Sequence, residues 1–316
     1  MFGPFRGYQR QWLRGDVVAG ITVAAIAVPE SLGYATIAGL PVQTGLYCAL
    51  LPAVAFALLA SSRQLVVGAD SATAALVAAG AATVATAGSA EYAGAVGVLG
   101  LMVAALLLLM AVARLGFLAD LISRPVLSGF LSGVGVSLII GKLPGVLGLD
   151  VSGTTWDKLT GTITSLDQIN VASALLGLGV VLTMVGYLKL PKKVPAALFA
   201  VVAFSALGYV FDVQDRGVAM VGAIPPGLPD LALPSFSAGD IPSMSATAVS
   251  IAIVILAQSA AVARSYGAKN GYPVNVTRDL AALSAANAGS AVTGGVAING
   301  SPPRTAAGDS AGGRTQ

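Results

Sequence analysis

The sequence has little charge, no histidine and a single cysteine. Only 10% of its 316 residues are charged, whereas a soluble globular domain carries about 25%. The absence of histidine excludes Ser-His-Asp and Cys-His catalysis and every His-ligated zinc site. Cys48 alone can form neither an internal disulfide nor a Cys-based metal centre. We therefore expect no enzyme, no cofactor and no metal, and nothing in the sequence indicates a nucleic-acid partner.

Hydrophobic residues make up 56% of the chain, and the mean hydropathy is +0.84. Because a helix needs about 20 apolar residues to cross a bilayer, this composition predicts an all-α, multi-pass membrane protein embedded in lipid. We expect full-length spans at Val17–Ala38, Thr44–Ala60, Ala93–Ala113, Val126–Leu149, Val171–Leu188, Val194–Val213, Ala246–Ala263 and Leu280–Thr293.

Two further apolar stretches, Leu65–Thr86 and Val296–Gln316, read as interrupted spans. Each opens with a short extended run, Leu65–Gly68 in the first and Val296–Asn299 in the second, and then meets a cluster of Gly, Pro or Ser. Only after that cluster does each stretch read as helix. We therefore predict two half-helices, at Ser71–Thr86 and Ser301–Gly313.

Lys and Arg are distributed unevenly along the chain, and this sets the orientation. With the N-terminus inside, most of the basic residues fall at cytoplasmic ends and most of the acidic residues fall outside, as the positive-inside rule requires. Residues 1–16 are then a cytoplasmic segment, and we expect the protein in the inner cell membrane. Arg304 alone falls at mid-membrane.

The sequence matches itself at an offset of 232 residues. At this offset Gly68 falls on Gly300, and Thr73 falls on Thr305. We therefore expect an inverted-repeat transporter fold, with residues 17–213 as a first repeat of seven spans. Residues 214–245 form a Pro-rich outer loop, and residues 246–316 begin an incomplete second repeat. Gly/Pro-interrupted segments at matching positions of two inverted halves indicate a transporter's binding site.

The two half-helices should bring their N-termini together at the bilayer centre. Their free N–H groups and positive dipole ends suit an anion. The expected substrate-binding residues lie at these two N-termini and on the neighbouring spans: Tyr34, Asp70, Ser71, Ala72, Gln258, Ser301, Pro303 and Arg304.

Three charged residues define the chemistry of this candidate site. A buried Arg in a membrane indicates function, and the acid that pairs with Arg304 could be Asp70 or Glu30. Asp70 could cap its helix or carry a coupling proton, and Glu30 could carry a proton or a sodium ion. If Asp70 is ionised in the empty site, it should pair with Arg304 and compete with the substrate, so that acid pH favours binding.

Several motifs resemble the sulfate permease (SulP) family. Val28-Pro-Glu-Ser-Leu-Gly-Tyr34, Ser61-Ser-Arg-Gln-Leu-Val-Val-Gly68 and Asn299-Gly-Ser-Pro-Pro-Arg304 occur in the order of that family's first, third and tenth spans. The resemblance implies fourteen spans in two inverted repeats, a core and a gate domain, elevator-type movement and a homodimer. It places Arg304 as the family's basic residue at the tenth span.

Three departures qualify the resemblance. We expect that the sequence stops inside the tenth span, without the family's last four spans and its cytoplasmic STAS domain. Gln258 stands where many members have an acid, and Asp70 where many have an uncharged residue. The expected function is secondary transport of sulfate, bicarbonate or a small carboxylate, with H+ or Na+ as a possible co-substrate. The alternatives are a nucleobase–cation symporter-like carrier and a passive anion channel of the same fold.

Overall fold

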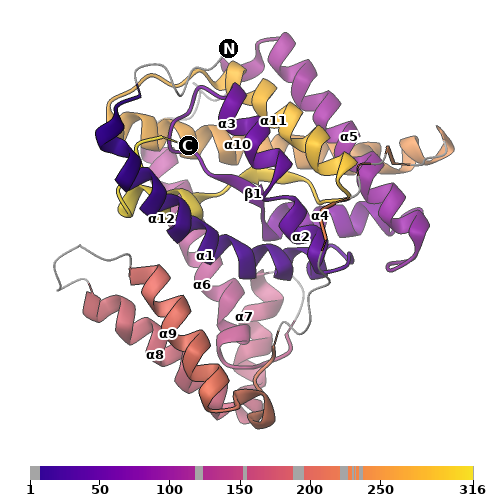
Figure 1. The fold of residues 1–316 in the computed structure, drawn as a ribbon. Coiled ribbons are helices and arrows are strands. Elements are labelled where there is room, and N and C mark those ends of the chain that lie inside the picture. Colours follow the sequence, from indigo (N-terminus) through magenta and orange to yellow (C-terminus); the bar gives the residue numbers. More distant parts are fainter. Residues whose placement is uncertain are drawn as a thin grey trace. The chain divides into compact units, whose positions relative to one another are not determined.

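The computed structural model describes residues 8–117, 124–151, 155–187, 196–220, 227–229, 231, 233–234 and 238–315. The chain forms two compact units, one made of residues 1–122 and 223–316 and the other of residues 123–222. We call them the first and the second unit and describe each by itself (Figure 1).

The first unit is built from eight α-helices and two short strands in its described part. In chain order they are α1 (Leu13–Ile37), α2 (Gln43–Tyr47), α3 (Leu51–Leu59), β1 (Val67–Ala69), α4 (Ser71–Ala81), α5 (Ala90–Val112), α10 (Ile241–Asn270), α11 (Val276–Val292), β2 (Ile298–Gly300) and α12 (Pro302–Ser310), with one-turn 3₁₀ helices at Arg10–Trp12 and Ala238–Asp240. Helix α11 packs against α5 and α3, α10 packs against α4 and α5, and α1 packs against α12.

Strands β1 and β2 form a two-stranded antiparallel ribbon, in which Val67 pairs with Gly300 and Gly68 pairs with Asn299. Helix α4 follows β1 and α12 follows β2, so the two helices leave the ribbon from opposite ends (Figure 1). The prediction of two extended segments that meet and continue as oppositely directed half-helices is therefore confirmed. Both half-helices are shorter than predicted, because α4 ends at Ala81 and α12 ends at Ser310.

The small side chains of α11 and α5 allow these helices to approach closely. A Cβ atom added at Gly100 of α5 would lie 3.1 Å from the Cβ of Ala291 in α11. Ser284 of α11 donates a hydrogen bond of 2.7 Å to the carbonyl of Ala104 in α5. Such small-residue contacts are typical of helices packed within a membrane, and they give the ribbon a rigid support.

The second unit contains the part of the chain with the spans predicted at Val126–Leu149, Val171–Leu188 and Val194–Val213. Its described helices are α6 (Arg124–Val146), α7 (Thr155–Thr164), α8 (Val171–Tyr187) and α9 (Ala196–Val210). A 3₁₀ turn at Leu166–Gln168 lies between α7 and α8, and another at Val213–Arg216 follows α9. Large apolar side chains on α8 and α9, such as Leu175 (63%) and Val202 (60%), are exposed. Exposed apolar faces of this kind fit helices that contact lipid.

The structure differs from the predicted elements in three places. The span predicted at Thr44–Ala60 is divided into α2 and α3, because Pro52 fits the first turn of a new helix and lacks the N–H that a continuous helix needs. Helix α7 lies between two predicted spans and was not expected. Helix α10 begins at Ile241, so the end of the predicted outer loop is already helical. Leu188, the last residue of one predicted span, and residues 194 and 195, the first two of the next, lie outside the described residues.

Three described helical segments are individually long and apolar enough to cross a membrane: residues 10–37, 90–112 and 241–270. Other apolar helices, including α4, α8 and α9, are shorter. In the first unit α4 is preceded by strand β1, so this interrupted span is part strand and part helix.

Candidate functional site

Asp70 is the N-cap residue of α4. Its Oδ1 accepts hydrogen bonds from the backbone N–H groups of Ala72 (2.7 Å) and Thr73 (3.0 Å). This is the usual arrangement of an aspartate at a helix N-terminus, where the carboxylate satisfies N–H groups that lack a partner within the helix. The α4 terminus was expected to offer free N–H groups to an anion. Two of them are instead occupied by the protein's own carboxylate.

The second oxygen of Asp70 contacts two amide side chains. Gln258 of α10 donates to Oδ2 at 3.1 Å, and Asn299 of β2 donates at 2.9 Å. Ser259 fixes the orientation of Asn299, because its hydroxyl donates to Asn299 Oδ1 at 2.9 Å and accepts from the N–H of Gly300 at 2.9 Å. Asp70 is therefore held from both sides by oriented N–H donors.

Arg304 lies in the first turn of α12 and is only 1% exposed. Its Nε donates to Glu30 Oε2 of α1 at 3.1 Å, which forms a salt bridge, and its Nη2 donates to the hydroxyl of Ser31 at 3.3 Å. The centre of the Tyr34 ring lies 5.9 Å from its guanidinium carbon, a distance at which a cation and an aromatic ring attract each other. One helix, α1, thus supplies all three partners.

Gly68 makes room for the guanidinium group. A Cβ atom built at Gly68 would overlap Nη1 of Arg304. Gly68 lies opposite Asn299 in the ribbon, and Asp70 follows it by two residues in extended conformation. Opposed residues and residues two apart share one face of such a ribbon. Arg304, Asp70 and Asn299 therefore lie on the same face.

The acid that pairs with Arg304 is Glu30. Of the two acids left open by the sequence, Asp70 has amide partners instead, and the expected competition between Asp70 and a substrate for the guanidinium group is not what the structure shows. Helix α12 also offers little backbone for an anion, because Pro302 and Pro303 in its first turn have no N–H. The N–H of Ser301 itself donates to the carbonyl of Val66 at 2.8 Å.

The structure brings most of the predicted site residues together at the ribbon. Ser71 and Ala72 form the first turn of α4, while Ser301 and Pro303 begin α12. Tyr34 is 3% exposed beside the guanidinium group.

Four residues of the site were not predicted: Gly68, Asn299, Ser259 and Ser31. Asn299 and Gly68 belong to motifs that were visible in the sequence. However, the pairing of the two strands was needed to see that they share a face with Asp70.

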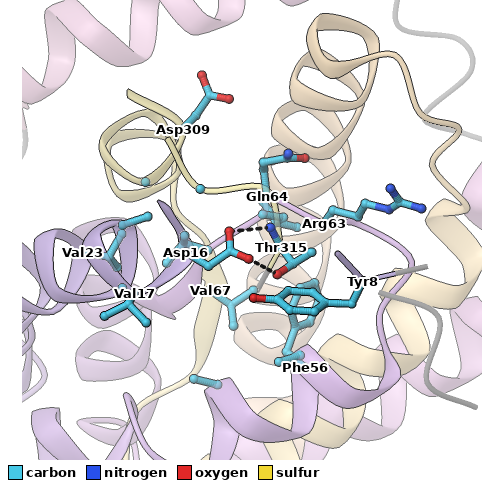
Figure 2. Close-up of a pocket in the computed structure, with 18 of the residues that line it drawn as sticks. Tyr8, Asp16, Val17, Val23, Phe56, Arg63, Gln64, Val67, Asp309 and Thr315 are labelled. Carbon is cyan, nitrogen blue, oxygen red and sulfur yellow. Dashed lines mark hydrogen bonds between the residues drawn. The ribbon is translucent and has the colours of Figure 1, made fainter. Parts of the chain in front are cut away.

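A separate cavity of about 610 Å³ lies between α1, α3 and the turn after α12. Its walls are mostly apolar, with Val17, Val23 and Phe56 among them, and none of the predicted site residues lines it. Asp16 closes one end, where its carboxylate accepts hydrogen bonds from the N–H and the hydroxyl of Thr315 at 3.1 and 2.7 Å (Figure 2). Because it shares no lining residue with the candidate site, this cavity is distinct from it.

The described residues contain no group of three or more His, Cys, Asp or Glu side chains that could hold a metal ion. What the junction of the ribbon and the two half-helices offers is one buried guanidinium group between two carboxylates and two amides. Such a set can bind a small polar or anionic ligand.

Comparison with known proteins gives a consistent result. The family model described as "Sulfate permease family" matches residues 13–316. A chain of Mycobacterium tuberculosis named "Probable sulfate transporter MT1781" is 39% identical over 313 residues, which are 99% of this chain and 56% of the relative. The "Sodium-independent sulfate anion transporter" of Bos taurus is 29% identical over an alignment of 343 positions. That alignment covers 96% of this chain and 56% of the relative. The chain thus spans about half the length of these relatives.

Solved structures show the same fold. The murine Slc26a9 anion transporter in its inward-facing state has a TM-score of 0.77 at 24% identity, covering 98% of this chain and 55% of that one. The transmembrane domain of the cyanobacterial bicarbonate transporter BicA has a TM-score of 0.73 at 23% identity, covering 98% of this chain and 79% of that one. With the family model matching nearly its whole length, the chain belongs to the sulfate permease family, a family of membrane transporters and not of enzymes.

Proposed function

We propose that the protein is a secondary transporter of small anions and that the anion binds at Arg304. The names of the relatives, which are sulfate and anion transporters, support the substrate class. The single observation that carries the proposal is the burial of Arg304, which is 1% exposed at the point where both interrupted spans meet. An arginine at this depth is retained only for a strong reason, and a planar guanidinium group suits oxyanions.

Uptake of labelled sulfate and hydrogencarbonate into proteoliposomes containing the full-length protein tests this proposal. Arg304→Ala should reduce uptake at least about 100-fold, because it removes a charged hydrogen-bond donor from a buried site. Arg304→Lys should restore part of it. Arg10→Ala, which removes an exposed arginine far along the chain from the site, is the matched control. Uptake by Arg304→Ala at the control level would place the anion elsewhere.

Glu30 is the coupling carboxylate in this proposal. An incoming anion replaces Glu30 at the guanidinium group of Arg304, which leaves the carboxylate, 20% exposed, without its cation. Loss of a cationic partner favours the neutral acid, so anion binding and proton uptake are linked. Among the described residues, Tyr34 interacts electrostatically with Glu30, Arg304 and Asp70, and Cys48 does so with Arg304. A proton agrees with the bovine relative, which is named sodium-independent.

The transport cycle itself is proposed to be of the elevator type, with a homodimer as the assembled form. Coupling separates this carrier from a passive channel. A channel only equilibrates the anion, whereas the carrier accumulates it when the vesicle exterior is acidified.

A nucleobase-like substrate is the second candidate, and one observation favours it. Asp70 lies beside the amides of Gln258 and Asn299, and acceptors and donors in one cluster can recognise a neutral, hydrogen-bonding ring. Labelled uracil is therefore included in the uptake assay. Uptake of uracil without uptake of either anion would favour this second function.

A further inference from the structure

We infer that Asp70 sets the charge of the accepted anion, so that the site binds singly charged anions in preference to doubly charged ones of the same shape. The inference rests on the proposed function, because it concerns the ligand of the same site. It runs against the simplest interpretation of the relatives' names, since sulfate is doubly charged at neutral pH.

The charges at the ribbon are unbalanced. Among the described side chains of the site, Arg304 is the one cation, and it is already paired with Glu30 at 3.1 Å. Asp70 adds a second carboxylate on the same face of the ribbon. If a proton neutralises Glu30 when the anion takes over Arg304, the bound anion still faces the negative charge of Asp70. A second charge on the anion doubles both its attraction to Arg304 and its repulsion by Asp70. Asp70 therefore offsets the gain at Arg304 that would otherwise repay the larger dehydration cost of a dianion.

Asp70 cannot easily turn away from the ligand. Four N–H groups donate to its two oxygens, from Ala72, Thr73, Gln258 and Asn299, at 2.7 to 3.1 Å. An ionised carboxylate has about four such acceptor positions, so all of them are used. The four donors therefore hold the carboxylate charge in one position, whereas a carboxylate on the surface could move away from a ligand.

Gln258 links the carboxylate of Asp70 to the backbone of Gly300. Its amide nitrogen donates both to Asp70 at 3.1 Å and to the carbonyl of Gly300 at 3.2 Å. A glutamate at position 258 would therefore place a carboxylate one hydrogen bond away from the present one. This allows the charge to be moved within the site while its total is kept constant.

The experiment measures binding of sulfate and of sulfamate to the full-length protein by calorimetry at one neutral pH. The two ions are both tetrahedral and similar in size, but sulfamate carries one charge and sulfate two. We expect wild-type protein to bind sulfamate at least about tenfold more tightly, because a full charge within several ångströms in a partly buried site changes affinity by that order.

Two neutral variants remove the charge while keeping a residue that caps helices. Asp70→Asn and Asp70→Ser both retain an oxygen for the α4 terminus, and both should lower the sulfamate-to-sulfate affinity ratio about tenfold. An asparagine at position 70 can direct its amide N–H groups toward those of Gln258 and Asn299, where donor faces donor. Serine has no amide group and avoids this repulsion. In the double variant Asp70→Asn with Gln258→Glu, the carboxylate is restored across the same contact, so the ratio should return to within about threefold of wild type.

The outcomes separate the two proposals. If wild-type protein binds neither ion and Arg304→Ala changes nothing, the proposed function fails. If wild-type protein binds both ions equally, or if both neutral variants keep the wild-type ratio, the inference about Asp70 fails while the anion site stands. The wild-type comparison needs no variant, so the inference can be overturned even if a substitution prevents folding.

Discussion

The N-termini of the two half-helices, α4 and α12, occupy matching positions of the repeat but are built differently. Helix α4 is capped by a carboxylate, because Asp70 accepts hydrogen bonds from two backbone N–H groups. Helix α12 begins with two prolines and has no side-chain cap, and its first turn carries Arg304. The repeat thus preserves the backbone path of the two spans and assigns opposite charges to their ends.

The contacts that cross between the halves show the same difference. Arg304 of α12 forms a salt bridge with Glu30 of α1 at 3.1 Å. Asp70, the N-cap residue of α4, accepts a hydrogen bond from Gln258 of α10 at 3.1 Å. One cross-contact is a salt bridge, and the other joins a carboxylate to a neutral amide. Because the repeat alone would make the two contacts equivalent, we propose that the residues that break its symmetry define the ligand.

The largest effect is expected at the two glycines of the ribbon that match in the repeat, Gly68 and Gly300. An added Cβ at Gly300 would lie 2.9 Å from the side chain of Ser259 and 3.0 Å from its Cα, so backbone must move. Gly300→Ala should lower the stability by about 1–3 kcal/mol, as other overpacking substitutions do. At Gly68 the obstructing group is the end of the Arg304 side chain. Gly68→Ala should therefore reduce anion affinity at least about tenfold with a smaller loss of stability.

Thermal melting and anion binding of the full-length variants test this difference. Gly20→Ala is the control, since no atom lies within 4 Å of its added Cβ. If Gly68→Ala loses stability as Gly300→Ala does and keeps its anion affinity, the two ends of the ribbon are equivalent and the comparison is wrong.

The second prediction compares the two carboxylates of the cross-contacts. Glu30 loses its cation when an anion takes over Arg304, whereas Asp70 keeps its N–H donors. Acid pH should therefore favour anion binding in wild-type protein, and Glu30→Gln should remove most of that pH dependence. Asp70→Asn should change the selectivity and leave the pH dependence in place. Binding measured across neutral and acidic pH checks this, and a pH dependence lost only in Asp70→Asn would make Asp70 the proton carrier.

Much of the ribbon could be predicted from the sequence, because its signals are local. The match of Gly68 with Gly300 and of Thr73 with Thr305 at one offset located both interrupted spans, and the strand pairing confirmed them. The break between α2 and α3 was missed although Pro52 was visible. In an apolar sequence a break between two helices is hard to recognise when no polar residue marks it.

The partners of the site residues could not be predicted in the same way. Glu30 and Arg304 are separated by 274 residues, and Asp70 and Asn299 by 229. Which acid meets the arginine depends on how α1 packs against α12, and spacing along the chain carries no information about that. The role of Asn299 depends further on the strand register, which places it opposite Gly68.

The smallest effect is expected at Thr73 and Thr305, which match in the repeat and are both fully buried. The Thr305 hydroxyl accepts a hydrogen bond from the N–H of Val66 at 3.1 Å, and the Thr73 hydroxyl donates one to the carbonyl of Ala297 at 3.1 Å. Valine has nearly the same shape as threonine, so these substitutions remove hydrogen bonds without creating a large cavity. Thr305→Val loses the bond from Val66, and Thr73→Val loses the bonds of its hydroxyl to the carbonyls of Ala297 and, at 3.3 Å, Asp70.

The two substitutions leave different groups without a partner. Thr305→Val strands the part-buried N–H of Val66, and a donor left unsatisfied away from water costs about 1–3 kcal/mol. Thr73→Val strands a carbonyl, which tolerates a missing partner better because it has two lone pairs. Thermal melting of the full-length variants should therefore place Thr305→Val below Thr73→Val by a few degrees. The reverse order would mean that the hydroxyl of Thr73, which lies next to Asp70, stabilises the charged end of α4 more than its hydrogen bonds to the two carbonyls imply.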